Sequence, residues 1–281
     1  MTAYAEVIGD PIAQSKSPAM HNHWLAGRAI DAEYRHAHVR APDLPAYIAA
    51  RRADGLWRGC NVTMPHKLAV MPLLDRIDDL AAQVGAVNTV VREADGTLTG
   101  YNTDVPGFME PILADGLPVR GKNALVLGAG GAARAIILGL ARAGMHLTVA
   151  ARDPAKAQAM LDELAPNEPM LAADLARFAR GGNGGFDLVV NASPLGMVGN
   201  PPLAFDLSHV ARGGTVYDII TAPLDTPLLV GARGLGLRVI DGLAMLIGQA
   251  DVAFAHFFGV APDRSDGDFA LRALLTAKAA G

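Results

Sequence analysis

Short β-rich runs alternate with longer helical patterns over most of the chain, and this alternation limits the folds that the sequence can adopt. The first three strand-like runs are AEVIG, AEYRHAHV and LWRGCNV, and helical patterns lie near residues 18–30, 43–53 and 66–82. Strands that are separated by helical crossovers usually pair in parallel. The sequence therefore predicts an α/β fold built on mostly parallel sheets.

Two series of strands follow one another along the chain. The first ends with the runs AVNTVV and TLTGY, and the turn residues Asp95 and Gly96 between them predict a hairpin. The second begins at KNALVLGAGGAARAIILGLARAG, and its predicted strands are residues 124–127, 147–151, 187–191, 215–219 and 237–240. We therefore expect two domains, with boundaries near residues 104 and 241.

Length, charge and cysteine content exclude several classes of protein. A chain of 281 residues, of which 51% are hydrophobic, is long enough for two modest domains with sizeable cores. The net charge of −4 provides no basic face for nucleic acid or anionic lipid. Cys60 is the only cysteine, so no intrachain disulfide can form, and a cytoplasmic location is expected.

The most apolar parts of the chain do not predict a secretory or membrane segment. The opening MTAYAEVIGD lacks the basic and apolar regions of a signal peptide. The late stretch GLAMLIGQADVAFAHFFGV carries Gln249, Asp251 and His256. These polar residues predict a buried amphipathic helix and not a membrane span.

The run VLGAGGAARA places three glycines between a buried strand and a helix. Gly128, Gly130 and Gly131 permit a tight turn and a close approach of backbone N–H groups to a pyrophosphate, which the helix N-terminus also attracts. Glycine and alanine also suit close packing of a strand on a helix without any ligand. The strand–loop–helix context favours dinucleotide binding.

The end of the next strand indicates which dinucleotide is bound. NAD-binding chains carry an acidic residue about 20 residues after the glycines. Here Ala150 and Ala151 end the strand and Arg152 follows, and a planar guanidinium suits a 2′-phosphate. Asp153 can instead hold a ribose, or cap the helix that begins at Pro154. The sequence favours NADP.

Six motifs occur in the order found in shikimate dehydrogenases, from residue 8 to about residue 250: IGDPIAQSKSPAMHN, NVTMPHK, GAVNTVV, GYNTDVPG, LGAGGAARA and DGLAMLIGQA. The chain resembles that family over nearly its whole length. The resemblance implies an α/β substrate-binding and catalytic domain of residues 1–104 and 242–281, whose C-terminal helices return to it. Residues 105–241 would form a Rossmann-type domain that binds NADP.

The resemblance implies an oxidoreductase that reversibly reduces 3-dehydroshikimate to shikimate in chorismate and aromatic amino-acid biosynthesis. Lys67 and Asp104 match the family's catalytic pair, which exchanges a proton with a ring hydroxyl as hydride is transferred. Both residues have simpler interpretations from the sequence alone. Lys67 can be a surface lysine at the start of a helix, and Asp104 can be a helix cap.

Short hydroxyl and amide side chains are expected to hold the substrate ring. By resemblance, Ser15 and Ser17 hold its carboxylate, although serines before a proline also cap helices. The remaining substrate-binding residues implied by the family are Thr63, Lys67, Asn88, Asp104, Thr221 and Gln249. Asn88 can otherwise be a turn residue, whereas Gln249 lies in an apolar helix and needs a polar partner if it is buried.

The cofactor residues come from the glycine loop, from the end of the following strand and from two later segments. They are Gly128, Ala129, Gly130, Gly131, Ala132, Ala151, Arg152, Asp153, Lys156, Ile219, Gly242 and Met245. The chain departs from the family pattern at four positions. Gln14 replaces a common histidine, Ala151 an asparagine, Thr221 a tyrosine and Ala244 a glycine.

Other chemistries have little support. The HNH run at residues 21–23 and the HAH run at 36–38 lack the cysteines or clustered carboxylates that complete a metal site, so no metal is expected. No GxSxG elbow of a serine hydrolase is present. The alternatives that remain are a quinate/shikimate dehydrogenase of broader substrate or NAD use, and a non-catalytic regulatory relative that binds shikimate. Monomer and homodimer are both left open.

Overall fold

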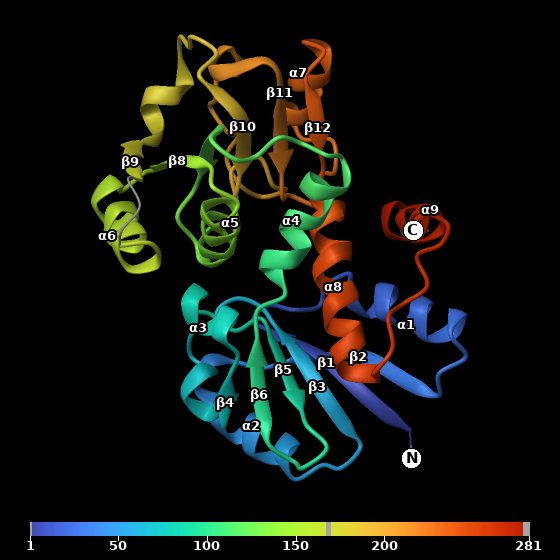
Figure 1. Ribbon diagram of the computed structural model, residues 1–281. Coiled ribbons are helices and arrows are strands. Elements are labelled where there is room, and N and C mark those ends of the chain that lie inside the picture. The colour runs from blue at the N-terminus through green and yellow to red at the C-terminus, as the bar shows by residue number, and fades with distance from the viewer. Residues whose placement is uncertain (1, 167–169, 278–281) are drawn as a thin grey trace. The chain divides into compact units, whose positions relative to one another are not determined.

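The computed structural model describes residues 2–166 and 170–277 (Figure 1). Contacts between Cα atoms divide the chain into two compact units. The first unit contains the residues up to Thr103 and those from Gln249 onward, and the second runs from Asp104 to Gly248. The division into a substrate-binding domain of residues 1–104 and 242–281 and an NADP-binding domain of residues 105–241 stays a prediction.

The first unit is built on a mixed sheet. Among the described residues it has six strands in the order β2-β1-β3-β5-β6-β4. Their bounds are β1 (Ala3–Gly9), β2 (Ala32–His38), β3 (Trp57–Val62), β4 (Arg76–Ile77), β5 (Thr89–Arg92) and β6 (Leu98–Tyr101). β1 pairs in parallel with β2 and β3, whereas β5 pairs antiparallel with β3 and β6. The predicted β5–β6 hairpin is confirmed, and Gly96 in its turn adopts a φ of 85°.

The helices of the first unit come from both ends of the chain. They are α1 (Ser17–Gly27), α2 (Leu44–Arg52), α3 (Asp79–Val84), the part of α8 (Gly242–Phe258) from Gln249 onward, and α9 (Phe269–Thr276). The Phe254 ring of α8 lies 5.7 Å from the Trp24 ring of α1. The Lys16 ammonium donates a hydrogen bond to the Leu275 carbonyl of α9 at 2.8 Å. The expected return of the C-terminal helices to this unit is confirmed.

The helix predicted over residues 66–82 is wrong. A turn follows His66, a 3-10 turn covers Met71–Leu73, β4 follows it, and α3 begins only at Asp79. Pro72 has no backbone N–H to donate within a continuous helix. The Asp78 side chain accepts a hydrogen bond from the Leu80 N–H at 2.9 Å and so caps α3 at a later point.

The second unit is built on a parallel sheet. Its described strands follow the order β12-β11-β10-β7-β8-β9, and every pairing is parallel. The bounds are β7 (Asn123–Leu127), β8 (His146–Ala151), β9 (Leu171–Asp174), β10 (Phe186–Asn191), β11 (Val210–Asp218) and β12 (Arg238–Ile240). Counted from β7, this is the doubly wound order of a Rossmann fold, so the expected α/β class is confirmed. The sequence did not predict β4 or β9.

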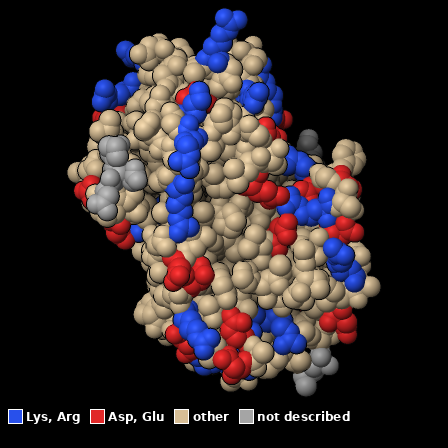
Figure 2. Space-filling view, in the orientation of Figure 1, with Lys and Arg blue, Asp and Glu red and all other residues tan. Residues whose placement is uncertain are grey.

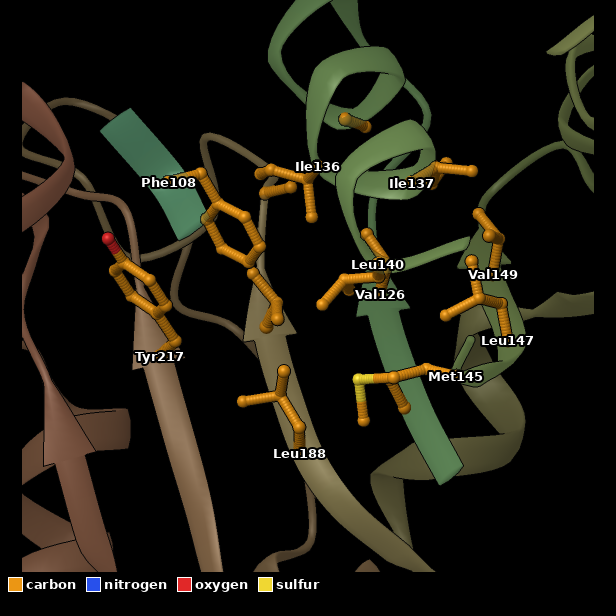
Figure 3. Packing of buried hydrophobic residues seen from close by; sticks show 14 of the residues in the cluster. Phe108, Val126, Ile136, Ile137, Leu140, Met145, Leu147, Val149, Leu188 and Tyr217 are labelled. Carbon is orange, nitrogen blue, oxygen red and sulfur yellow. The ribbon is translucent and has the colours of Figure 1, made fainter. Parts of the chain in front are cut away.

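Apolar side chains cover both faces of this sheet. The helices of the unit are α4 (Asp104–Ala114), α5 (Gly131–Arg142), α6 (Pro154–Leu164), α7 (Pro227–Gly234) and the first turns of α8. In β7, Val126 packs with α4 and α5, as Phe108 and Ile136 in Figure 3 illustrate. The neighbouring Leu127 points to the other face, where it packs with Leu229 of α7. The long apolar runs of the sequence thus form strands that are buried on both faces.

The surface carries both signs of charge. On the face shown in Figure 2, basic and acidic side chains are interspersed and do not form one basic patch. Among the helices that the structure describes, none combines the length and the hydropathy needed to cross a lipid bilayer.

Candidate active site

The chain beyond the carboxyl end of β3 is fixed to the neighbouring end of β1. The Thr63 N–H donates a hydrogen bond to the Ile8 carbonyl at 3.0 Å. The Met64 carbonyl accepts one from the Asp10 N–H, also at 3.0 Å. Parallel strands place their carboxyl ends at one edge of a sheet, which is where ligands bind in α/β folds. The NVTMPHK motif is held at this edge.

Lys67 lies in a turn and not on a helix. The residue before it, His66, is fully buried, and its Nε2 lies 2.6 Å from the Val39 carbonyl oxygen. The Lys67 carbonyl accepts a hydrogen bond from the Val87 N–H at 2.9 Å. The Lys67 side chain is half-buried. Lys67 is therefore not at the start of a helix, and its catalytic role stays a prediction.

A buried network around Asn88 holds the residue that precedes Asp104. The Asn88 Oδ1 accepts hydrogen bonds from the Thr103 N–H at 2.7 Å and from the Thr89 hydroxyl at 3.0 Å. The Asn88 Nδ2 donates to the Thr103 Oγ1 at 3.0 Å. Asn61 extends the network, because its Nδ2 donates to the Thr89 Oγ1 at 3.0 Å. Asn88 is therefore a buried structural residue and not an ordinary turn residue.

Asp104 is the first residue of α4 and is only 6% exposed. A carboxylate at this position interacts favourably with the N-terminus of its own helix. The Thr103 N–H, one residue earlier, donates a hydrogen bond to the Asn88 Oδ1. Thr103 and Asn61 belong to the quoted motifs, but neither residue has a sequence signal of its own that predicts this role.

Ser15 and Ser17 lie next to each other at the start of α1. The Ser15 hydroxyl donates a hydrogen bond to the Ser17 Oγ at 3.2 Å and accepts one from the Ser17 N–H at 3.3 Å. The N-cap residue of α1 is Lys16, whose side chain makes no capping hydrogen bond. The His36 Nε2 lies 2.9 Å from the Ser15 carbonyl oxygen. The serines thus order the turn before α1, with two hydroxyl groups side by side.

The remaining predicted substrate residues come from separate elements. Gln249 is half-buried in α8, and Thr221 is half-buried in the segment after β11. Thr63 is half-buried directly after β3. All three side chains are therefore partly accessible to solvent. The substrate role of each residue stays a prediction.

A pocket with a volume of about 640 Å³ lies at the carboxyl edge of the parallel sheet in the second unit. Seven of the predicted cofactor residues line it: Gly128, Ala129, Gly130, Ala151, Arg152, Asp153 and Lys156. The loop after β10 forms another wall through Ser193, Pro194 and Leu195, which were not predicted from the sequence. The sequence signal for that loop was only a Ser–Pro turn after a strand.

The three glycines at the junction of β7 and α5 differ in what they permit. Gly128 has a φ of 116°, and a Cβ there would lie 3.0 Å from the backbone of Ala192. Gly130 is the N-cap of α5, and neither Gly130 nor Gly131 has an atom within 4 Å of a Cβ built on it. Gly128 therefore serves the turn, whereas Gly130 and Gly131 leave the helix N-terminus open to an anion.

Arg152 and Asp153 have different environments. The Asp153 side chain accepts a hydrogen bond from the Lys156 N–H at 3.1 Å and caps α6, with Pro154 at the first helical position. The exposed side chains of Arg152 and Lys156 make no hydrogen bond or ion pair with the residues that the structure describes. Two basic side chains, Arg152 and Lys156, thus line the pocket without a protein partner among the described residues. The Asp153 carboxylate is engaged in the hydrogen bond that caps α6.

Five other predicted cofactor residues do not line this pocket: Gly131, Ala132, Ile219, Gly242 and Met245. Met245 is 6% exposed and belongs to the apolar core. Gly242 is buried against the backbone of Ile219, where a Cβ would approach the carbonyl carbon at 2.6 Å. The packing accounts for these two residues without a ligand, and their cofactor role stays a prediction.

A buried carboxylate at the ends of β10 and β11 was also missed. Asp218 is fully buried and accepts hydrogen bonds from the Asn191 Nδ2 at 3.1 Å and from the Thr226 hydroxyl at 2.8 Å. Burial raises the pKa of the Asp218 carboxyl. The Asn191 Oδ1 in turn accepts from the Ser193 hydroxyl at 2.7 Å. This network fixes the loop that carries Ser193.

The histidine pairs do not resemble metal ligands. His21 is buried among aromatic rings and stacks on Tyr34 at 4.0 Å, whereas His23 is exposed. The His38 Nε2 contacts the Asp10 Oδ1 at 2.7 Å. Within residues 2–166 and 170–277, no three His, Cys, Asp or Glu side chains are grouped as metal ligands.

Comparisons with known proteins identify the family. Residues 7–90 match the family model described as the shikimate dehydrogenase substrate binding domain. A relative from Sphingopyxis alaskensis, named shikimate dehydrogenase (NADP(+)), is 50% identical over 98% of this chain and 97% of its own.

Two solved structures share the fold over nearly the whole chain. Shikimate 5-dehydrogenase from Thermus thermophilus, in complex with NADP(H) and shikimate, is 35% identical with a TM-score of 0.83, covering 97% of this chain and 99% of that one. Quinate dehydrogenase from Corynebacterium glutamicum, in complex with NAD, is 37% identical with a TM-score of 0.84, covering 94% and 96%. The chain belongs to the shikimate dehydrogenase family of oxidoreductases.

Proposed function

We propose that this protein catalyses the NADP-dependent, reversible reduction of 3-dehydroshikimate to shikimate, a step of chorismate and aromatic amino-acid biosynthesis. The observation that carries the proposal is the 50% identity, over 98% of the chain, to a protein named shikimate dehydrogenase (NADP(+)). Bound NADPH supplies the hydride, and the protein must supply a proton to the substrate oxygen. We place the reaction in the cytoplasm, with the protein as a monomer or a homodimer.

Lys67 and Asp104 are the proposed catalytic pair. During reduction the Lys67 ammonium gives a proton to the carbonyl oxygen while the hydride reaches the carbonyl carbon, and the reverse reaction returns the proton to Lys67. The Asp104 carboxylate orients the reacting hydroxyl and balances the lysine charge. Two observations support the assignment: the turn that carries Lys67 is fixed through its carbonyl to Val87, and Asp104 follows a residue that Asn88 fixes.

The proposed substrate contacts follow from the chemistry of a polyhydroxylated ring carboxylate. The adjacent hydroxyls of Ser15 and Ser17 bind the carboxylate. Thr63, Asn88, Gln249 and Thr221 bind ring hydroxyls. Asn88 also has a structural role, because its amide already binds Thr103.

The pocket of the second unit fits NADP. The open N-terminus of α5 at Gly130 and Gly131 suits the pyrophosphate. The Arg152 guanidinium, with Lys156 beside it on the pocket wall, suits the 2′-phosphate. Asp153 is engaged as the cap of α6, which supports NADP over NAD, because a free carboxylate there would favour ribose hydroxyls.

A quinate/shikimate dehydrogenase is the second candidate. It is favoured by the 37% identity to a quinate dehydrogenase whose structure contains NAD. We also infer that Thr221, where the family usually has a bulky tyrosine, would leave more room for a bulkier ring substrate such as quinate. A regulator without catalytic activity is disfavoured, because both Lys67 and Asp104 are present.

Initial rates with shikimate and quinate, each measured with NADP⁺ and with NAD⁺, test the proposal. We expect the highest kcat/KM for shikimate with NADP⁺. A higher kcat/KM for quinate with NAD⁺ would establish the second candidate, and shikimate binding without turnover under any of the four conditions would indicate a regulator.

A further inference from the structure

A large bulge in β11 interrupts its pairing with β10. Val210 pairs with Phe186 and Thr215 with Leu188, so residues 211–214 of β11 lie opposite the single residue Asp187. Gly213 in the bulge has a φ of 74°, a backbone conformation that residues with a side chain rarely adopt. A Cβ on Gly214 would lie 2.9 Å from the Ala211 carbonyl oxygen. The bulge therefore depends on its two glycines.

The bulge borders a pocket of about 160 Å³ at the amino edge of the parallel sheet. Its apolar lining includes Ile112, Leu117, Val119, Met145 and Leu188. An apolar cavity of ~150 Å³ in a protein interior is large enough to bind benzene. One aromatic ring therefore matches the volume and the lining of this pocket.

Two arginines give the pocket a positive rim. Arg212 of the bulge and Arg238 at the start of β12 both line it, and both side chains are exposed. Neither side chain makes a hydrogen bond or ion pair with the part of the chain that the structure describes. Asp187 also lines the pocket, but it is engaged by the Lys122 ammonium at 3.3 Å and the Asn123 N–H at 3.0 Å.

We propose that this pocket is a second ligand site, for a small aromatic carboxylate whose ring contacts the apolar wall and whose carboxylate binds Arg212 and Arg238. A guanidinium fork binds a carboxylate with two parallel hydrogen bonds. An inorganic anion leaves the apolar wall in water, and an uncharged ring leaves both guanidinium groups without a partner. One ligand with a ring and a carboxylate satisfies both parts of the pocket.

The site is distinct from the cofactor pocket. The two pockets share no lining residue. The cofactor pocket lies beyond the carboxyl ends of β7, β8 and β10, whereas this one lies at the amino ends of β10, β11 and β12. Binding here therefore does not require NADP to leave.

Benzoate is a suitable probe, titrated into ¹⁵N-labelled full-length protein with saturating NADP⁺ and shikimate. We expect saturable amide shifts at Val119, Leu188 and Gly213, and at least about tenfold weaker binding of benzyl alcohol, which lacks the charge. Shifts confined to residues outside the pocket, or equal binding of the two probes, would overturn the proposal. The readout does not depend on whether the protein turns over shikimate.

Paired arginine variants provide a second test. Arg212→Ala/Arg238→Ala should weaken benzoate binding by about tenfold or more and leave benzyl alcohol binding unchanged. Arg177→Ala/Arg180→Ala removes the same charge from exposed positions of the same unit and should leave benzoate binding at the parental level. Equal benzoate affinity in the two double variants would reject the site. Because all four side chains are exposed, both variants are expected to melt near the parental temperature.

Discussion

At the scale of single residues, hydrogen bonds distinguish the roles of side chains that the sequence alone could not tell apart. Asp153 and Arg152 are neighbours, and each can be assigned to a cofactor from the sequence alone. In the structure Asp153 caps α6, whereas Arg152 has no protein partner among the described residues. Removal of Arg152 is therefore expected to affect cofactor choice, whereas removal of Asp153 is expected to affect stability.

Removal of Arg152 should change the choice of cofactor. Arg152→Ala is expected to reduce kcat/KM for NADP⁺ by about ten- to a hundredfold, because a charged hydrogen bond is worth about 1.5–3 kcal/mol. Efficiency with NAD⁺ should change little, since NAD lacks the 2′-phosphate. Steady-state kinetics with both cofactors measure this. If an Arg152→Ala/Lys156→Ala variant still prefers NADP⁺, the phosphate is held elsewhere.

Removal of Asp153 should instead affect stability. Asp153→Ala loses the hydrogen bond to the Lys156 N–H and is expected to lower the free energy of unfolding by about 1 kcal/mol. Urea denaturation measures the loss, and Asp153→Asn, which retains a capping oxygen, serves as the matched control. A marked fall in NAD⁺ efficiency with unchanged stability would show that Asp153 binds ribose.

Removal of the Lys67 amine should affect turnover more than binding. Lys67→Ala is expected to lower kcat by ~10²–10⁴-fold, the usual contribution of a general acid or base, while NADP⁺ still binds in the pocket of the second unit. Stopped-flow turnover and calorimetric titration of NADP⁺ separate the two effects. The control is Lys122→Ala, which breaks a partly exposed ion pair with Asp187. Near-parental turnover in Lys67→Ala would exclude the catalytic assignment.

At the scale of elements, helices and strands could be predicted from the sequence where hydrophobic periodicity and turn residues mark them. The strands around the glycine loop are apolar runs that alternate with helical patterns, and a mostly parallel sheet was expected from them. Periodicity failed over residues 66–82, because Pro72 breaks a helical pattern that hydrophobic spacing alone suggests. β9 was missed because Leu171–Asp174 contains no β-branched or aromatic residue and is held mainly by pairing with β8.

Part of the candidate site was predicted from residues that have a local sequence signal. Gly128, Gly130 and Arg152 line the pocket, and their role in cofactor binding stays a prediction. The Asn88–Thr103 hydrogen bonds and the buried Asp218 network were not predicted, because they join residues that lie apart in the sequence. Hydrogen bonds of this kind follow from the fold and have no local sequence signal.

The first residue of α8, Gly242, lies where the neighbouring backbone leaves no space for a side chain. A Cβ on Gly242 would overlap the Ile220 carbonyl oxygen and approach the Ile219 carbonyl carbon at 2.6 Å. Gly242→Ala is therefore expected to lower the free energy of unfolding by about 1–3 kcal/mol. In α7, Gly234 has open space around a Cβ, and Gly234→Ala should be neutral or slightly stabilising. Urea denaturation of both variants tests the difference, and equal stabilities would contradict it.

At the scale of the whole molecule, each unit has a sheet and an apolar core of its own. The cluster around Trp57 and Val90 belongs to the first unit, and the cluster around Val126 and Ile136 to the second. In the second unit the two edges of one sheet carry two pockets that share no residue. The strands of a parallel sheet are buried on both faces, so packed side chains separate its carboxyl edge from its amino edge.

The stability of the molecule should depend on pH through His21. This residue is fully buried between α1, β2 and α8, stacks on Tyr34 and lies 5.9 Å from the Phe254 ring. Neither of its ring nitrogens has a hydrogen-bond partner among the described residues. Burial lowers the pKa of His21 from 6.5 to about 3.

A lowered histidine pKa destabilises the folded state in acid. Above pH 6.5 the ring is neutral in both states, and its protonation has no effect on folding. Below that pH His21 binds a proton in the unfolded chain but stays neutral in the folded chain. The free energy of unfolding therefore falls as the pH decreases from 6.5 toward 3. The slope from this one group is about 1 kcal/mol per pH unit in that window.

His21→Phe should remove this part of the acid sensitivity, because phenylalanine keeps a flat ring against Tyr34 and cannot be protonated. Urea denaturation at pH 7.5, 5.5 and 4.5 gives the free energy of unfolding of parent and variant. We expect the difference between them to grow in favour of the variant as the pH falls. His23→Phe, at an exposed position of the same helix, is the control and should follow the parent. If the His21→Phe and parental curves stay parallel down to pH 4.5, His21 is protonated in the folded state, and its burial between the aromatic rings does not control acid stability.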